Sequence, residues 1–369
     1  MIVLYAITLF ITGIYSYALV DPNLTLVNSH LWETFRNVMV HFGYYQRDVS
    51  ATVYIFLVVF LFIFHFWFVK KYKRYSPIII ALIVGIIFLF SYPFLSHDFF
   101  NYMFDAKILT WYHQSPYLYR ALDFPKDPWL RFLQWTERTY PYGPVFLLLS
   151  AVPSFLAFGK FVIDFILFKA MFVGFYLLSV AVLARMNKKW ALSFATHPLV
   201  LIEGLISSHN DLISVSLGIV GVYYLLQKSQ ILSRLFFLLS AGIKYITLPL
   251  VFLSKNKKAS VIILVSIIII LVYLSIKSEI QPWYLLALFV FLPFYENLIN
   301  EINIFLAGLL FSYYPYVRFN EWGNSKNIQM KHEIILIFLG LNILYFLAKK
   351  IVLKKMKFSP KWSISKAKS

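Results

Sequence analysis

The chain has 369 residues, of which 60% are hydrophobic and 14% are charged, and its mean hydropathy is +0.73. Soluble domains carry about 25% charged residues, so this composition excludes an ordinary water-soluble protein. Apolar runs such as residues 78–90 and 261–274 do not alternate with period two, which excludes a membrane β-barrel. The absence of cysteine excludes disulfides, thiolate metal sites and cysteine nucleophiles. The sequence therefore predicts an all-α, polytopic transmembrane helical bundle.

The apolar runs, taken in chain order, predict about twelve membrane segments in one domain of residues 1–369. They cover residues 2–20, 53–69, 77–92, 143–158, 161–184, 190–206, 212–226, 232–253, 261–276, 283–294, 302–314 and 334–349. Several approach the roughly 20 residues needed to cross a bilayer. The first run has no basic start and no small-residue cleavage site, so we expect an anchor and not a removed signal peptide.

The net charge of +18 is concentrated at alternate ends of these runs. Five clusters without Asp or Glu hold more than half of the 34 Lys and Arg residues: 70–74, 185–189, 228–234, 255–258 and 349–369. Such clusters mark the cytoplasmic ends of membrane helices. We therefore expect cytoplasmic N- and C-termini, a basic cytoplasmic tail at 349–369 and an extracytoplasmic loop at 93–160. Because orientation explains the charge, no nucleic-acid partner is predicted.

Two runs cannot cross as single helices if all five clusters lie on one side. Residues 143–158, interrupted by Pro153, are predicted to lie in the outer interface instead of crossing. Residues 232–253 lie between two basic clusters, so we expect two short helices that meet near Lys244 and Tyr245. Non-helical backbone at membrane depth is tolerated only beside a protein cavity, so this break points to a site.

The outer loop begins with a candidate base. Asp98 follows His97 at the mouth of a membrane helix, where partial burial can tune a carboxylate for proton transfer. If Asp98 opens a helix, Tyr102 and Asp105 lie on the same face. The alternative is a solvated carboxylate, which is how we interpret Asp123 and Asp127 further along the loop.

A second polar island contains His209, Asn210 and Asp211. It forms either a tight turn that caps the next helix or the floor of the cavity that holds Asp98. A His–Asp pair can bind a divalent metal, but two ligands do not complete a site, so no metal or other cofactor is predicted. Glu203 and Lys244 are intramembrane ionisable residues and hence functional candidates. Their structural alternatives are a buried ion pair and snorkelling.

Nucleotide-binding loops are missing from the sequence: it contains neither G-x-x-x-x-G-K-[ST] nor G-x-G-x-x-G. The sequence therefore gives no support to a nucleotide-driven pump or a soluble nucleotide-sugar fold, and a sugar donor, if there is one, is expected to arrive attached to a membrane lipid.

The order of several motifs resembles the GT-C superfamily of polyprenyl-phosphate-sugar-dependent glycosyltransferases, and most closely its membrane alpha-mannosyltransferases. The motifs are His97-Asp98-x-x-Asn101-Tyr102, Ser115-Pro116-Tyr117, the closing Tyr140-Pro141-Tyr142-Gly143-Pro144, His197-Pro198-Leu199, His209-Asn210-Asp211, Lys244-Tyr245-x-x-Leu248-Pro249 and Pro282-Trp283-Tyr284. The resemblance covers about residues 77–295. It departs from the family pattern at His197, where Asn is usual, and at Tyr142-Gly143, where Tyr-Pro-Pro is common.

The resemblance implies a GT-C-like fold whose outer catalytic loop bears interface helices. It implies an enzyme that moves a hexose, in the first instance mannose, from a polyprenyl-phosphate donor to an extracytoplasmic glycan or lipid acceptor, with inversion. By analogy Asp98 is the base, while Lys244, Arg120 and Arg131 are candidates for binding the donor phosphate. The candidate substrate contacts are His97, Tyr102, Asp105, Tyr142, Glu203, His209, Asn210, Asp211, Tyr245, Trp283 and Tyr284.

Two other functions remain open at this stage. A transporter or flippase of lipid-linked saccharides would share the spans, Glu203 and Lys244 but would need no base; the lack of an inverted repeat argues against it. A non-catalytic membrane subunit would use the outer loop to bind a partner.

Overall fold

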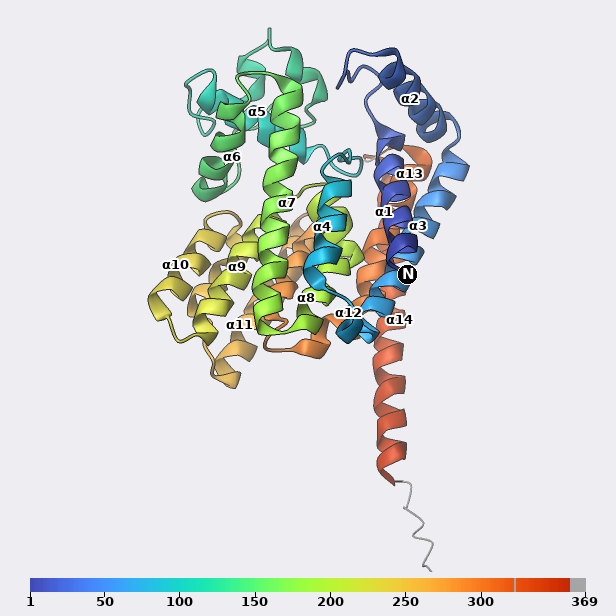
Figure 1. The fold of residues 1–369 in the computed structure, drawn as a ribbon, viewed down its shortest axis with the longest axis vertical. Helices are drawn as coiled ribbons and strands as arrows, with labels where there is room; N and C mark the ends of the chain where they lie inside the picture. The colour runs from blue at the N-terminus through green and yellow to red at the C-terminus, as the bar shows by residue number, and fades with distance from the viewer. Residues whose placement is uncertain (322, 359–369) are drawn as a thin grey trace, which may run out of the picture.

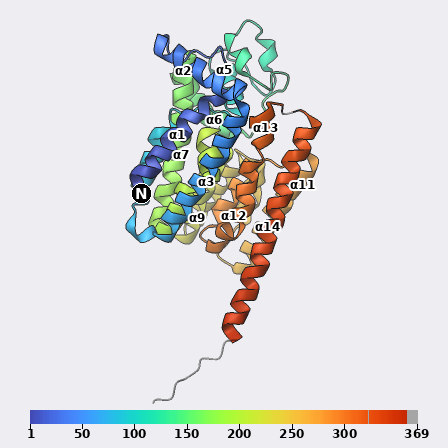
Figure 2. The ribbon, with the colours of Figure 1, turned by 90° about the vertical axis from the view of Figure 1, so that its right-hand side faces the viewer.

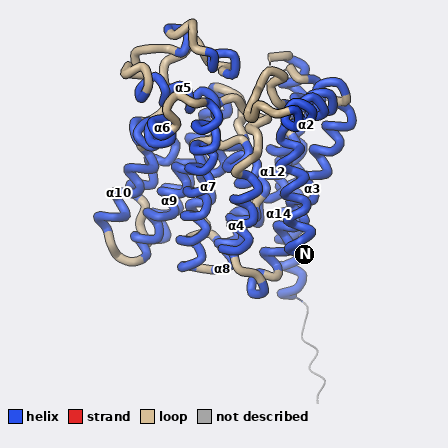
Figure 3. Tube along the Cα trace, turned by 45° about the horizontal axis from the view of Figure 1, so that its top comes forward, coloured by secondary structure: helices blue, strands red, loops and turns tan. Residues whose placement is uncertain are grey.

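The computed structural model describes residues 1–321 and 323–358, and these residues form helices and loops without strands (Figure 3). The α-helices are α1 (Ile2–Tyr15), α2 (His30–Val40), α3 (Arg47–Lys70), α4 (Pro77–Phe88), α5 (Asp98–Thr110), α6 (Pro144–Leu156), α7 (Phe161–Met186), α8 (Lys188–Thr196), α9 (Asp211–Leu226), α10 (Gln230–Ala241), α11 (Lys257–Lys277), α12 (Glu296–Phe311), α13 (Tyr314–Phe319) and α14 (Ser325–Phe358). Short 3₁₀ or π segments are η1 (Ser16–Leu19), η2 (His41–Tyr45), η3 (Tyr72–Arg74), η4 (Ala121–Asp123), η5 (Pro128–Phe132), η6 (Val200–Ile206), η7 (Tyr245–Phe252) and η8 (Pro282–Phe291). The last eleven residues of the expected basic tail lie outside the described residues.

Five described helices are long and apolar enough to cross a membrane: α1 with η1, α3, α7, α11 and α14. The pair η6 and α9, bent by 112°, adds a sixth if it counts as one broken span. In these five windows half or fewer of the residues are buried, so much of their apolar surface faces outward, as a bilayer requires. The predicted helical membrane bundle is confirmed, whereas the count of about twelve segments and the single domain stay predictions.

The basic clusters gather at one end of the bundle. The α3–α4 and α7–α8 connections and the end of α14 lie toward the bottom of Figure 1, and α2, α5 and α6 lie toward the top. Two hydrogen bonds tie the clusters together at this end. Lys188 donates to the Lys73 carbonyl at 2.9 Å, which joins two clusters directly. Lys255 donates at 2.9 Å to the carbonyl of Leu226, two residues before the 228–234 cluster. This arrangement agrees with the predicted orientation, which itself stays a prediction.

The C-terminal part closes the bundle on the side seen in Figure 2, where α12 runs beside α3 and α14 runs beside α12. The Asn342 side chain of α14 bonds to the Glu301 carbonyl at 3.0 Å and to the Phe305 N–H at 3.2 Å. These bonds, together with the ion pair between Lys349 and Glu301 at 3.2 Å, fix α14 against α12.

Helix α6 is too short to cross the membrane. Its 13 residues extend about 20 Å at 1.5 Å per residue, against a hydrocarbon core of about 30 Å. It starts with Pro144 at its first position and packs against α5, where Thr110 and Ser154 share a hydrogen bond of 2.8 Å. Its length fits the predicted interface helix, and the outer face, with exposed Leu148 and Phe155, is apolar.

One carboxylate of the outer loop is not solvated as expected. Asp127 is buried, forms an ion pair with Lys107 at 2.5 Å, and accepts hydrogen bonds from Tyr112 and from the Trp129 backbone. The prediction for Asp127 was wrong because Lys107, on the inner face of α5, needs a partner and the loop folds back to supply it. Asp123 remains at the surface and pairs with Arg120.

The predicted break near Lys244 is present. Helix α10 ends at Ala241, η7 begins at Tyr245, and Lys244 between them is extended. The outer loop closes on this break, because the Val145 N–H donates to the Gly242 carbonyl at 3.1 Å. A Cβ at Gly143 would lie 2.0 Å from that carbonyl oxygen, so only glycine permits the approach.

Candidate active site

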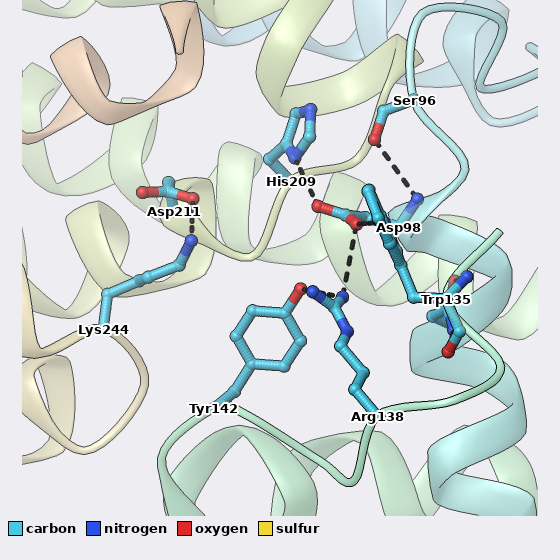
Figure 4. A network of polar contacts seen from close by, with 9 residues as sticks. Ser96, Asp98, Trp135, Arg138, Tyr142, His209, Asp211 and Lys244 are labelled. Atoms are coloured by element: carbon cyan, nitrogen blue, oxygen red, sulfur yellow. Dashed lines mark hydrogen bonds and ion pairs between the residues drawn. The ribbon is translucent and has the colours of Figure 1, made fainter. Parts of the chain in front are cut away.

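Asp98 is the first residue of α5, where the helix dipole favours negative charge. Its backbone N–H donates to Ser96 at 3.2 Å (Figure 4). The carboxylate accepts a hydrogen bond from the Trp135 indole at 3.2 Å, and the Arg138 guanidinium lies 3.6 Å from the same oxygen. The second oxygen faces Nδ1 of His209 at 3.8 Å. Two distant segments of the chain, the end of the outer loop and the turn before α9, therefore converge on Asp98.

Burial raises the pKa of Asp98, while Arg138, Lys244 and the Trp135 hydrogen bond oppose the rise. A carboxylate in such an environment gains proton affinity and still has cations that hold it ionised, which suits a general base. One and two turns further along α5 lie Tyr102, which packs edge-on against Tyr142, and Asp105. Burial raises the pKa of Asp105 to about 7.

His209 lies in the turn between η6 and α9 and contacts three site residues. Its ring stacks on Trp283 with 3.8 Å between centroids and 16° between planes. Its Nε2 lies 3.4 Å from the Glu203 carboxyl, and both side chains are fully buried. Asn210 is the N-cap residue of α9, as the tight-turn alternative expected, but its side chain makes no cap hydrogen bond.

Lys244 forms an ion pair with Asp211 at 2.9 Å and lies over the rings of Tyr142 and Tyr284, 5.4 Å from each centroid (Figure 4). It does not snorkel, since its side chain is only 17% exposed. The sequence left the partner of Lys244 undetermined. The ammonium already neutralises a buried carboxylate, so an incoming phosphate must share it with Asp211.

Sequence reasoning missed Arg138 and Trp135. The Arg138 guanidinium lies over the rings of Trp135 and Tyr142, donates to the Tyr142 hydroxyl at 3.3 Å and is 38% exposed. The available signal was position: both residues lie just before the motif that closes the outer loop at Tyr140. From the sequence, Arg120 and Arg131 were named as phosphate-binding candidates instead of Arg138.

Three predicted residues, Arg120, Arg131 and Tyr245, lie apart from this cluster, and two others, His97 and Asn210, lie beside it without a hydrogen bond to its side chains. Arg120 pairs with Asp123, and Arg131 lies over the Phe132 ring, so no described contact brings either one to Asp98. Tyr245 points outward and is exposed. His97 packs beside Phe100, and Asn210 is buried with no hydrogen-bond partner for its amide.

The turn that carries His209 is held by a residue that the sequence did not indicate. Lys169 of α7 is buried and donates to the carbonyls of Leu205 at 2.7 Å and Ile206 at 2.8 Å. It also reaches the hydroxyls of Ser91 and Ser208, each at 3.1 Å. Ser208 has a φ of 56°, a strained conformation for a non-glycine residue. The ammonium thus holds the end of η6 and the strained turn in place.

A family model described as alpha-(1->6)-mannopyranosyltransferase, N-terminal domain, matches residues 6–255. The chain belongs to this mannosyltransferase family. The resemblance to GT-C mannosyltransferases is therefore confirmed, and the protein is a membrane-embedded glycosyltransferase that transfers mannosyl groups from a sugar donor to a glycan acceptor. Comparisons with curated proteins and with solved structures found no match.

The matched range holds most of the cluster of this mannosyltransferase. Asp98, Arg138, His209 and Lys244 lie inside it, whereas Trp283 and Tyr284 on η8 lie beyond its end. The match also includes the first two spans, which the motif resemblance did not cover. In the described part of the chain, no group of three or more His, Cys, Asp or Glu side chains has the geometry of a metal site.

Proposed function

We propose that the protein transfers mannose from a polyprenyl-phosphate donor to an extracytoplasmic glycan, with Asp98 as the general base. The observation that carries the proposal is a partly buried carboxylate that two cations from separate segments act on: Arg138 at 3.6 Å and, through its charge, Lys244. Family membership supports mannose as the sugar that is transferred. The distribution of basic clusters supports the extracytoplasmic side.

In the proposed reaction the acceptor oxygen attacks the anomeric carbon while its proton moves to Asp98. The bond from that carbon to the phosphate oxygen breaks, and the electron pair leaves with polyprenyl phosphate. Attack opposite the leaving group inverts the anomeric carbon, so an alpha product requires a beta-linked donor. The alpha-(1->6) description of the family favours the 6-hydroxyl of a hexose as the attacking group.

The leaving phosphate gains negative charge as the bond breaks, and nearby cations stabilise that charge. Arg138 is partly exposed and presents the forked donor geometry that suits phosphate. Lys244 is the second candidate, shared with Asp211. We therefore propose Arg138 and Lys244 for the phosphate, ahead of Arg120 and Arg131.

The aromatic residues Tyr142, Trp283 and Tyr284 frame this space, and we propose that they line the sugar subsite. Apolar and aromatic walls with a few polar groups are the usual composition of a small-molecule site. The proposed reaction uses the carboxylate, the two cations and these rings, and none of its steps requires a cofactor.

The proposal is tested with the purified full-length protein in lipid nanodiscs. Polyprenyl-phosphate mannose, polyprenyl-phosphate glucose and nucleotide-linked mannose are offered separately with a mannose disaccharide as acceptor. Mass spectrometry measures released polyprenyl phosphate, and NMR determines the linkage of the product. We expect product only with lipid-linked mannose and a new alpha-(1->6) bond. Transfer from the nucleotide sugar, or no transfer from any donor, would contradict the proposal.

A further inference from the structure

Behind the proposed base lie two buried residues that have no step in the proposed reaction. Glu203 and His209 have no exposed surface, so they cannot contact a substrate in the way Asp98 can. The imidazole lies between two carboxyl groups, with Nδ1 3.8 Å from Asp98 and Nε2 3.4 Å from Glu203, and neither nitrogen makes a hydrogen bond within the described part of the chain. Such a buried polar chain needs an explanation, because native proteins rarely bury polar groups without use.

The imidazole is held in one orientation. Its ring stacks on Trp283 nearly in parallel, which prevents free rotation. Its backbone follows Ser208 in a strained conformation, and Lys169 fixes the carbonyls on the other side of that turn. The two nitrogen atoms must therefore face the two carboxyl groups in a defined way.

When the imidazole closes on both carboxyl groups as the site tightens around its substrates, the donors and acceptors allow one arrangement of protons. An ionised Asp98 can only accept hydrogen bonds, so the facing Nδ1 has to carry the proton of a neutral imidazole. Nε2 can then only accept. The Glu203 carboxyl that faces it has to carry a proton and donate it.

We propose that Glu203 and His209 are positioning residues for Asp98: Glu203 fixes the tautomer of the imidazole, and His209 presents an N–H donor to the carboxylate. This inference rests on the proposed function, in which Asp98 is the base. The donor orients one carboxylate oxygen, while Trp135 and Arg138 orient the other. A free lone pair remains for the acceptor hydroxyl.

Charged and titratable groups from several elements act on Asp98, His209 and Glu203. They are His97, Arg138, Asp211, Lys244, Tyr313 and Lys331. Burial of the imidazole, and in addition the positive charge of Lys244, disfavour a second proton on it. The neutral tautomer therefore fits the surroundings of His209.

Removing the N–H donor has a defined effect on the pH profile. An N–H directed at an ionised carboxylate stabilises the charged form, so His209→Leu raises the pKa of Asp98. The acid limb of kcat/KM then moves to higher pH by about one unit, and the donor KM changes little. Glu203→Leu shifts the acid limb of kcat/KM in the same direction. Glu203→Gln keeps an N–H donor toward Nε2, so its limb stays at the wild-type position.

A matched control is a buried histidine outside the cluster. His65 is fully buried and bonds to Thr196 at 3.0 Å. His65→Leu should leave the acid limb where it is. If His209→Leu keeps the wild-type limb while Asp98→Asn abolishes transfer, the positioning proposal is wrong and the proposed function stands.

The tautomer itself is measured without activity, by ¹⁵N NMR of histidine-labelled protein in nanodiscs. The chain has eight histidines, and the signal missing in His209→Leu identifies the residue. We expect protonated Nδ1 and bare Nε2 in the wild type and in Glu203→Gln, and a mixture in Glu203→Leu. An Nε2–H tautomer in the wild type, or an unchanged signal in Glu203→Leu, would overturn the proposal. This readout decides the tautomer even if the wild type transfers no mannose.

Discussion

Replacing Lys169 by methionine tests whether the turn behind the site is held by one ammonium. Methionine fills a similar volume but cannot donate. Leu205 keeps a second donor, because the Ser208 hydroxyl also bonds its carbonyl at 2.8 Å. The Ile206 carbonyl has no second donor among the described bonds. One buried acceptor is therefore left without a partner, which costs about 1–3 kcal/mol.

We expect Lys169→Met to lower the melting temperature moderately and to lower kcat at least tenfold, since the turn carries His209. The donor KM should change less than kcat. The assay combines thermal unfolding in detergent with mannosyl transfer at saturating donor. Lys160→Met, an exposed lysine just before α7, is the control and should change neither quantity. A Lys169→Met protein with wild-type kcat would refute the proposal that the Lys169 ammonium holds the turn that carries His209.

Three further predictions concern charge and orientation. Lys244→Met should weaken donor binding about tenfold to a hundredfold. Adding Asp211→Asn to this variant should restore the stability of the fold but not the affinity for the donor. A Lys244→Met protein with wild-type donor affinity would remove Lys244 from the phosphate site. The melting temperature of Asp105→Asn should rise relative to that of the wild type as pH rises from 5 to 8. Burial raises the pKa of Asp105 to about 7, so the folded wild type loses stability as its carboxyl is forced to ionise over this range. A difference in melting temperature that does not depend on pH would contradict this prediction. In intact cells an impermeant thiol reagent should label Leu118→Cys, on the outer loop, but not Lys257→Cys, and the reverse pattern would invert the orientation.

The sequence predicted the main architecture because membrane burial leaves a direct signal. Continuous apolar runs and acid-free basic clusters follow from the cost of placing charge or unpaired backbone in lipid. The same argument predicted the break at Lys244, since 232–253 could not cross once and still connect two basic clusters. It also predicted a non-crossing helix at residues 143–158, where α6 lies, and α5 does begin at Asp98, the condition under which Tyr102 and Asp105 were expected to share its face.

Contacts between distant segments were beyond the sequence. Arg138 and Trp135 reach Asp98 only because the outer loop folds back over α5, and nothing in their spacing encodes that path. Asp127 was assigned to solvent because its partner Lys107 lies 20 residues away. Lys169 reads as one more lysine in an apolar run, and its role depends on carbonyls more than 30 residues further along.

The central claim is that Asp98 takes the proton of the acceptor hydroxyl. Asparagine is nearly isosteric with aspartate but cannot accept the proton, so transfer by Asp98→Asn should fall by about a hundredfold to ten-thousandfold. The phosphate is assigned to Arg138 and Lys244, so donor binding should survive. Asp123→Asn, at the surface of the same loop, is the control and should stay active.

The most direct measurement compares these two variants with the wild type in single-turnover transfer from bound polyprenyl-phosphate mannose. The account predicts that Asp98→Asn binds the donor with near wild-type affinity and forms almost no product in the time the wild type completes one turnover. Wild-type product formation by Asp98→Asn would contradict the assignment of the base.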